Sequence, residues 1–120
     1  MPSNHSLGEW GEDAARLFLE MCGYKCLDRR WRRSGGEIDL VVQRDGLLVF
    51  VEVKTRGPRC GTGPEAWVTR PQLRRLRRMA VRWIAEHPGC RNRGYRFDVV
   101  AVAHGGSRGG SEIRHLVGVA

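Results

Sequence analysis

Residues 36–56 read GEIDLVVQRDGLLVFVEVKTR, two apolar segments joined by Asp45-Gly46. Asp-Gly between such segments is one of the strongest short signals for a β-hairpin, because a type I′ turn needs positive φ at both central residues. If these two residues form the turn, Arg44 pairs with Leu47, and the pairing of all other residues follows. The sequence therefore predicts two antiparallel strands in a defined register.

This register places four charged side chains on one face of the hairpin. Asp39 lies opposite Glu52, Glu37 lies opposite Lys54, and strand alternation puts all four on the same side. Phe50 and Val41 share that face, so we expect it to be partly buried. The opposite face is entirely apolar and is expected to be the core: Ile38, Leu40, Val42, Val49, Val51 and Val53.

Two carboxylates directly opposite each other in a sheet repel. With about 5 Å between them and an effective dielectric of about 20, the cost is on the order of 3 kcal/mol before screening. Mg²⁺ would offset this charge, since it takes oxygen ligands and keeps several waters. The alternative is a solvated hairpin face whose acids and Lys54 pair loosely in water.

Lys54 is unusual for this chain. Of the 21 basic residues only Lys25 and Lys54 are lysines, and all the others are arginines. A lysine supplies a compact charge that can orient a water or stabilise developing phosphate charge, whereas the planar arginine fork does so less flexibly. Lys54 is therefore a candidate catalytic residue beside Glu52.

Helical periodicity flanks the hairpin on both sides. Residues 7–22 carry apolar positions at three- and four-residue steps, and Gly23 follows as a helix-ending residue. A second helix begins at Thr69, where Gln72 completes a capping box, and Pro88-Gly89 stops it. The expected apolar stripes are Leu7, Trp10, Ala14, Leu17, Phe18 and Met21 in the first helix, and Leu73, Leu76, Ala80, Trp83 and Ile84 in the second.

Three further strands complete the expected order α-β-β-β-α-β-β. They cover residues 24–31, 96–102 and 112–117, and a Gly/Pro-rich loop over residues 56–65 is expected to be mobile or to contact substrate. Because strand-helix-strand connections are right-handed, residues 96–102 should run parallel to residues 47–55. The prediction is an α/β fold in which helices pack against a mixed sheet.

Composition indicates a polyanionic partner. The 120 residues carry a net charge of +8, and five arginines crowd the second helix: Arg74, Arg75, Arg77, Arg78 and Arg82. The other explanation for that charge is a GC-rich genome, which raises arginine content without any nucleic-acid partner. The chain has no membrane-length apolar run and no signal sequence, so we expect one cytoplasmic domain over residues 1–120. Its four cysteines lack the paired spacing of a zinc site.

Asp39 followed by Glu52-Val53-Lys54 resembles the D…E-x-K signature of the PD-(D/E)XK nuclease superfamily. The chain resembles more closely the YraN-type family, small bacterial proteins classed as endonuclease-like and similar in fold to archaeal Holliday junction resolvases. The motifs that carry this likeness run in order along nearly the whole chain: Gly8…Gly11-Glu12…Ala15, GEIDL, FVEVKTR, Ala66…Val68-Thr69 and RFDVV.

The resemblance implies a restriction-endonuclease-like three-layer core. By it, Asp39 and Glu52 are metal ligands for Mg²⁺ or Mn²⁺, Lys54 is the catalytic lysine, and Glu12 is a further acidic residue near the metal. It permits a homodimer but identifies no interface. The chain departs from the family at Gln72, where a lysine is common, and at its C-terminus, where the family usually continues to an aromatic residue.

Two functions are compatible with these features. One is a metal-dependent endonuclease acting on branched or otherwise structured DNA, with the second helix and Arg56 holding the phosphate backbone. The other is a non-catalytic nucleic-acid-binding module with the same fold. We expect Glu37 to pair with Lys54 structurally, and Asp98, in an apolar strand, to be an ion-pair or hydrogen-bonding partner instead of a ligand.

Overall fold

The computed structural model describes residues 6–56, 68–105 and 110–120. The elements are α1 (Leu7–Met21), β1 (Lys25–Arg33), β2 (Gly36–Arg44), β3 (Leu47–Arg56), α2 (Arg70–Ala85), the short 3₁₀ helix η2 (Pro88–Cys90), β4 (Tyr95–His104) and β5 (Ser111–Leu116). Apart from η2, this is the predicted order. Most of the predicted loop over residues 56–65 lies outside the described residues. No helix within those residues is long and apolar enough to cross a membrane.

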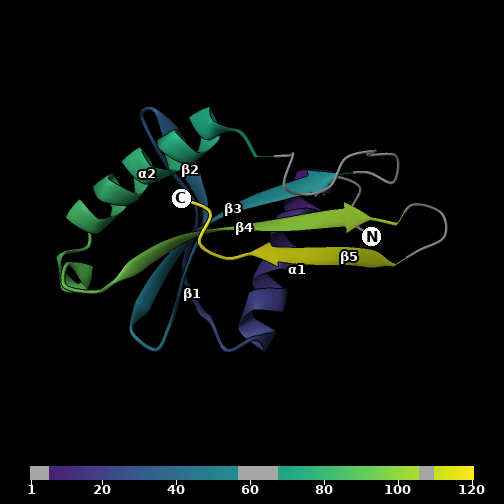
Figure 1. The fold of residues 1–120 in the computed structure, drawn as a ribbon, viewed down its shortest axis with the longest axis horizontal. Coiled ribbons are helices and arrows are strands. Elements are labelled where there is room, and N and C mark those ends of the chain that lie inside the picture. Colours follow the sequence, from purple (N-terminus) through teal and green to yellow (C-terminus); the bar gives the residue numbers. More distant parts are fainter. Residues whose placement is uncertain (1–5, 57–67, 106–109) are drawn as a thin grey trace.

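The described strands form one mixed sheet in the order β1-β2-β3-β4-β5 (Figure 1). β3 and β4 are parallel, as the crossover rule predicts, and the other neighbours are antiparallel. One buried cluster joins α1 to the sheet through Ala15 and Leu19, and a second joins α2 through Leu76 and Trp83. Since a helix layer covers each face of the sheet, the three-layer α/β fold is confirmed.

The hairpin turn forms as predicted. Asp45 and Gly46 have φ values of 53° and 78°, the positive values that a type I′ turn requires. β2 and β3 then pair from Arg44–Leu47 to Leu40–Val51 in the predicted register. The ladder ends at that last pair, so Asp39 and Glu52 lie immediately beyond it.

Strand alternation breaks beside Asp39. In the β1–β2 ladder Arg29 pairs with Leu40 and Trp31 pairs with Ile38, which leaves Arg30 facing Asp39. Leu40 packs in the α1 cluster, whereas Trp31 and Ile38 pack in the α2 cluster. Residues two apart therefore point to opposite faces, and Arg30 has the left-handed φ of 50° that accompanies such a break.

The prediction that Ile38 shares a core face with Leu40 and Val42 is therefore wrong. A strict period of two cannot show a local break on two paired strands. Both faces of the hairpin are also core, because α1 and α2 cover opposite sides of the sheet.

The buried face of α1 also differs from the prediction. Three of the predicted residues, Trp10, Ala14 and Phe18, are partly buried against the core, but the fully buried residues are Gly11, Ala15 and Leu19. Leu17 is 53% and Met21 87% exposed. A Cβ at Gly11 would lie 1.9 Å from Thr55 Oγ1, so the missing side chain lets α1 approach β3 closely. Small residues at a close helix–strand contact do not register as an apolar stripe, which explains the error.

The predicted helix ends are confirmed. Gly23, with φ of 93°, follows α1, and the Gly23 and Tyr24 amides donate to Glu20 and Leu19 carbonyls in a Schellman motif. At the start of α2 the Thr69 hydroxyl accepts from the Gln72 amide (3.4 Å), and the Gln72 side chain accepts from the Thr69 amide (2.9 Å). This capping box fixes Gln72 at the first turn of α2.

Candidate functional site

Asp39 occupies the point where β2 and β3 separate. Its Oδ2 accepts a hydrogen bond from the Val53 amide at 2.8 Å, so the side chain satisfies a backbone donor that the ladder leaves unpaired. The residue is 6% exposed. Its side chain is thus held in a fixed position between the two strands.

The carboxyl groups of Asp39 and Glu52 lie close enough to influence each other's pKa. Burial raises the pKa of Asp39 to about 8, and the charge of Glu52 adds to this rise. Burial also raises the pKa of Glu52, although Lys54 and a hydrogen bond with Asp39 lower it in part. Two adjacent buried carboxyls that both resist ionisation are arranged to share a proton or to bind a cation.

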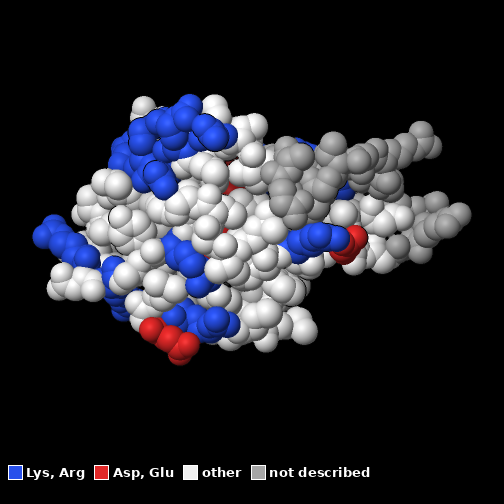
Figure 2. Space-filling model, in the orientation of Figure 1, with Lys and Arg blue, Asp and Glu red and all other residues white. Residues whose placement is uncertain are grey.

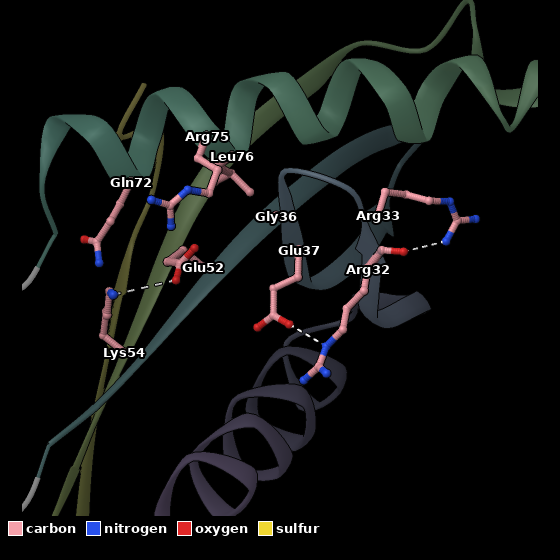
Figure 3. A pocket seen from close by; sticks show the side chains of 9 residues that line it. All are labelled: Arg32, Arg33, Gly36, Glu37, Glu52, Lys54, Gln72, Arg75 and Leu76. Atoms are coloured by element: carbon pink, nitrogen blue, oxygen red, sulfur yellow. Dashed lines mark hydrogen bonds and ion pairs between the residues drawn. The ribbon is translucent and has the colours of Figure 1, made fainter.

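Lys54 follows Glu52 on the same side of β3. Its Nζ lies 3.7 Å from Glu52 Oε1, and the two side chains are only 13% and 21% exposed. Figure 3 shows this pair beneath α2, with Arg75 reaching down from the helix toward Glu52. The Arg75 charge also lowers the Glu52 pKa, which places its guanidinium within electrostatic range.

These residues border a pocket of about 520 Å³ between the sheet and the first turns of α2. Glu52, Lys54 and Glu37 line it from the strands, and Gln72, Arg75 and Leu76 line it from the helix. Arg32 and Arg33 complete the lining from the end of β1. With four cations against two acids, the pocket suits an anionic ligand that can also approach Glu52.

The sequence interpretation did not single out Arg32 and Arg33. Both lie at the end of β1, beyond the predicted strand limit of residue 31, and only the β1–β2 turn brings them beside Gly36 and the pocket. The available signal was the basic run Arg29–Arg33 preceding the acidic GEIDL motif.

Glu37 does not pair with Lys54, contrary to the prediction. Its Oε2 accepts from Arg32 Nε at 2.7 Å, and these residues pair across the β1–β2 ladder. Because the hairpin ladder stops at Leu40–Val51, Glu37 is not opposite Lys54, and the neighbouring strand supplies its partner.

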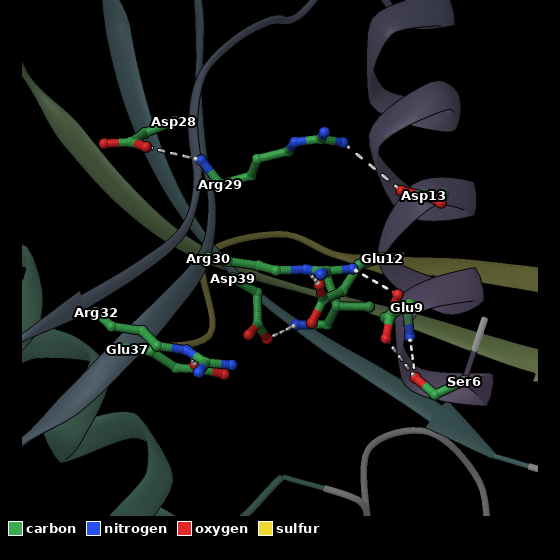
Figure 4. A network of polar contacts seen from close by, with 11 residues as sticks. Ser6, Glu9, Glu12, Asp13, Asp28, Arg29, Arg30, Arg32, Glu37 and Asp39 are labelled. Carbon is green, nitrogen blue, oxygen red and sulfur yellow. Dashed lines mark hydrogen bonds and ion pairs between the residues drawn. The ribbon is translucent and has the colours of Figure 1, made fainter. Parts of the chain in front are cut away.

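Glu12 projects from α1 and forms an ion pair with Arg30 (Figure 4). Its negative charge is among those that raise the pKa of Asp39, so it lies within electrostatic range of the acid pair. Arg30 also lies 3.9 Å from Glu9. Glu12 is thus near the acid pair, but its charge is balanced by the strand residue that faces Asp39.

Asp39 and Glu52 form a two-carboxylate set. No group of three or more His, Cys, Asp or Glu side chains in the described parts of the chain converges as a metal site. Mg²⁺ is commonly held by one or two carboxylates and retains waters, so the donor chemistry of this pair fits that ion.

The predicted phosphate-binding arginines have different surroundings. Arg74, Arg75, Arg77, Arg78 and Arg82 are all exposed on α2, and Figure 2 shows basic side chains gathered over that helix. Arg82 donates to the Ser34 carbonyl at 2.6 Å, and Arg56 donates to the Thr55 carbonyl at 3.0 Å. Of this set, Arg75 lines the pocket.

Asp98 is a structural residue, as predicted. It is fully buried and accepts two hydrogen bonds from Arg96 at 2.8 Å, one from the Gly118 amide at 3.0 Å, and a contact from His115 Nε2 at 2.6 Å. Burial would raise the pKa of Asp98, but the hydrogen bonds outweigh burial and lower it to about 2. No pattern in the sequence indicates that His115 belongs to this network.

The chain matches known proteins along nearly its whole length. The model of the uncharacterised protein family UPF0102 matches residues 11–102. A UPF0102 protein of Frankia casuarinae is 46% identical over 119 residues, covering 98% of both chains. One from Beutenbergia cavernae is 44% identical over 99% of both, and one from Symbiobacterium thermophilum is 50% identical over 82% of this chain and 83% of its own. The chain therefore belongs to the UPF0102 family, which is the YraN-type family that its motifs resemble.

Proposed function

We propose that this protein is a divalent-metal-dependent endonuclease that hydrolyses phosphodiester bonds in branched or otherwise structured DNA. The observation that carries the proposal is geometric: Asp39 accepts from the Val53 amide beside Glu52, and Glu52 lies 3.7 Å from Lys54 at the edge of an arginine-lined pocket. This is the residue set that the D…E-x-K resemblance assigns to metal binding and catalysis.

Asp39 and Glu52 would hold Mg²⁺ or Mn²⁺. Both carboxyls must lose their protons for this, and the cation would then stabilise the charged forms that burial disfavours. Such an ion supplies Lewis acidity, which activates water and offsets charge on the scissile phosphate.

The remaining residues of the site position the substrate. The Val53 amide fixes Asp39, and Lys54 places a half-buried ammonium where phosphate charge develops. Arg32, Arg33 and Arg75 border the same pocket and suit phosphate oxygens. Contacts of this kind orient a nucleic acid without reading its bases, so we expect selection by DNA shape and not by sequence.

Titration calorimetry tests the metal requirement. Mg²⁺ and Mn²⁺ should bind the wild-type protein, and Asp39→Asn should weaken binding at least about tenfold by removing one of two charged ligands. Asp45→Asn is the matched control, because Asp45 is 93% exposed in the hairpin turn, where Asn-Gly is equally favourable. Absence of binding by the wild type would contradict the nuclease and favour a non-catalytic nucleic-acid-binding module.

A further inference from the structure

A second concave surface lies on the other flank of α2. Two adjoining cavities of about 540 and 340 Å³ share Arg77 and Ala120 and together form one groove between α2, the start of β4 and the C-terminal residues. We call it the α2–β4 groove. Its apolar lining is Leu73, Val81, Ile84, Tyr95, Phe97 and Val119.

Tyr95 gives this groove an exposed aromatic surface. The residue is 53% exposed, although its ring packs edge-on against Phe97 with 5.7 Å between centroids and also contacts Phe50 at 6.3 Å. These contacts restrain the ring on one side and leave the rest open. A restrained, half-exposed ring suits stacking, because little conformational freedom is lost on binding.

The charged side chains that line the groove are all basic. Arg70, Arg74 and Arg77 line it and are exposed, and no acidic residue is among the described residues that line either cavity. Planar apolar groups joined to phosphates are therefore the complementary ligand: the guanidinium groups suit the phosphates and the apolar floor suits a base.

The groove and the arginine-lined pocket lie on different flanks of one helix. Gln72, Arg75 and Leu76 face the pocket, whereas Leu73, Arg77 and Ile84 face the groove. A helix with its side chains is about 10–12 Å wide. A DNA strand leaving the pocket would cross the exposed arginines of α2, which are continuous with the groove's arginine border (Figure 2).

We propose that the α2–β4 groove binds an unpaired nucleotide of single-stranded DNA, with the base stacked on Tyr95 and the flanking phosphates held by Arg74 and Arg77. The proposal rests on the proposed function, since it makes the protein select DNA in which a single-stranded segment adjoins the cleaved strand. Such a contact would favour DNA with an unpaired nucleotide over continuous duplex DNA.

The test measures binding without turnover. Fluorescence anisotropy in EDTA compares a 15-nucleotide oligo-dT with a blunt duplex, on the wild type, Tyr95→Ala and Tyr95→Phe. Tyr95→Ala should lower affinity for oligo-dT about tenfold and change duplex affinity less than about twofold, whereas Tyr95→Phe should retain both. Circular dichroism checks that each variant is folded. Oligo-dT containing 5-iodouracil should cross-link to Tyr95.

Equal oligo-dT affinity for wild type and Tyr95→Ala would overturn the proposal, as would cross-links elsewhere than the groove. The proposal would also be overturned if oligo-dT did not bind and an acidic peptide with one Phe bound tightly in the groove instead. Because the binding assay contains no metal, it tests the groove even if the protein proves not to be a nuclease. If the wild type cleaves DNA and Tyr95→Ala binds oligo-dT as well as the wild type does, the groove proposal is rejected and the nuclease proposal stands.

Discussion

At the scale of single residues, burial of Asp39 beside Glu52 disfavours the charged forms of both carboxyls and so raises their pKa values. Asp39 is buried beside a second acid because its carboxylate takes the Val53 amide where the β2–β3 ladder ends. Groups with strongly shifted pKa values cluster at functional sites, so this pair is a candidate functional site. Asp98, equally buried, has Arg96 and His115 as partners and a lowered pKa, so burial alone does not distinguish a functional acid.

The raised pKa of Asp39 predicts how stability depends on pH. Its folded pKa lies above its unfolded value of about 3.9, so the native state binds more protons and stability falls as pH rises from about 4 toward about 8. In EDTA, the melting temperature of the wild type should therefore fall between pH 5 and pH 8 by at least about 4 °C more than that of Asp39→Asn.

Thermal melts followed by circular dichroism measure this difference. Asp45→Asn should follow the wild type, because the exposed Asp45 carboxylate lies outside the buried pair. If the melting temperatures of wild type and Asp39→Asn changed with pH in the same way, the pKa of Asp39 would not be raised in the folded protein.

At the scale of elements, local signals predicted the hairpin and the helix ends, since the Asp-Gly turn, the Thr69–Gln72 capping box and Gly23 depend on neighbouring residues alone. The break in alternation at Arg30 and Asp39 was not predictable, because it involves two strands at once. Neither was the buried face of α1. The break matters most for the site, because it accompanies the separation of β2 from β3 at Asp39.

The contact between α1 and β3 predicts a severe effect of Gly11→Ala. The added Cβ would lie 1.9 Å from Thr55 Oγ1 and 2.9 Å from both Thr55 Cβ and Cγ2, so rotating the threonine does not relieve the clash. We expect a loss of about 3 kcal/mol in the free energy of unfolding, measured by urea denaturation. Gly8→Ala is the control, since its Cβ would meet only Ser6 Oγ at 3.9 Å. Equal stability of the two variants would refute this packing.

At the scale of the whole molecule, part of the basic charge of this +8 chain gathers beside the acid pair. Arg32 and Arg33 from β1 and Arg75 from α2 converge on the pocket that Glu52 and Lys54 enter from β3 (Figure 3). Sequence could assign the acids and Lys54 through their motif, but the pocket combines segments that are distant in the chain. The fold therefore brings candidate phosphate-binding cations and candidate metal ligands to one place.

Cleavage of a branched DNA substrate tests the nuclease proposal most directly. Rates should be compared in Mg²⁺ and in Mn²⁺ for wild type, Lys54→Arg and Lys54→Ala, each at protein concentrations that saturate the DNA. The wild type should cleave, and both variants should bind the DNA equally well while losing at least about tenfold in rate, because an arginine fork does not replace a compact ammonium beside Glu52. Equal rates for wild type and Lys54→Arg would remove the catalytic role of Lys54, and no cleavage by the wild type with either ion would contradict the proposed nuclease.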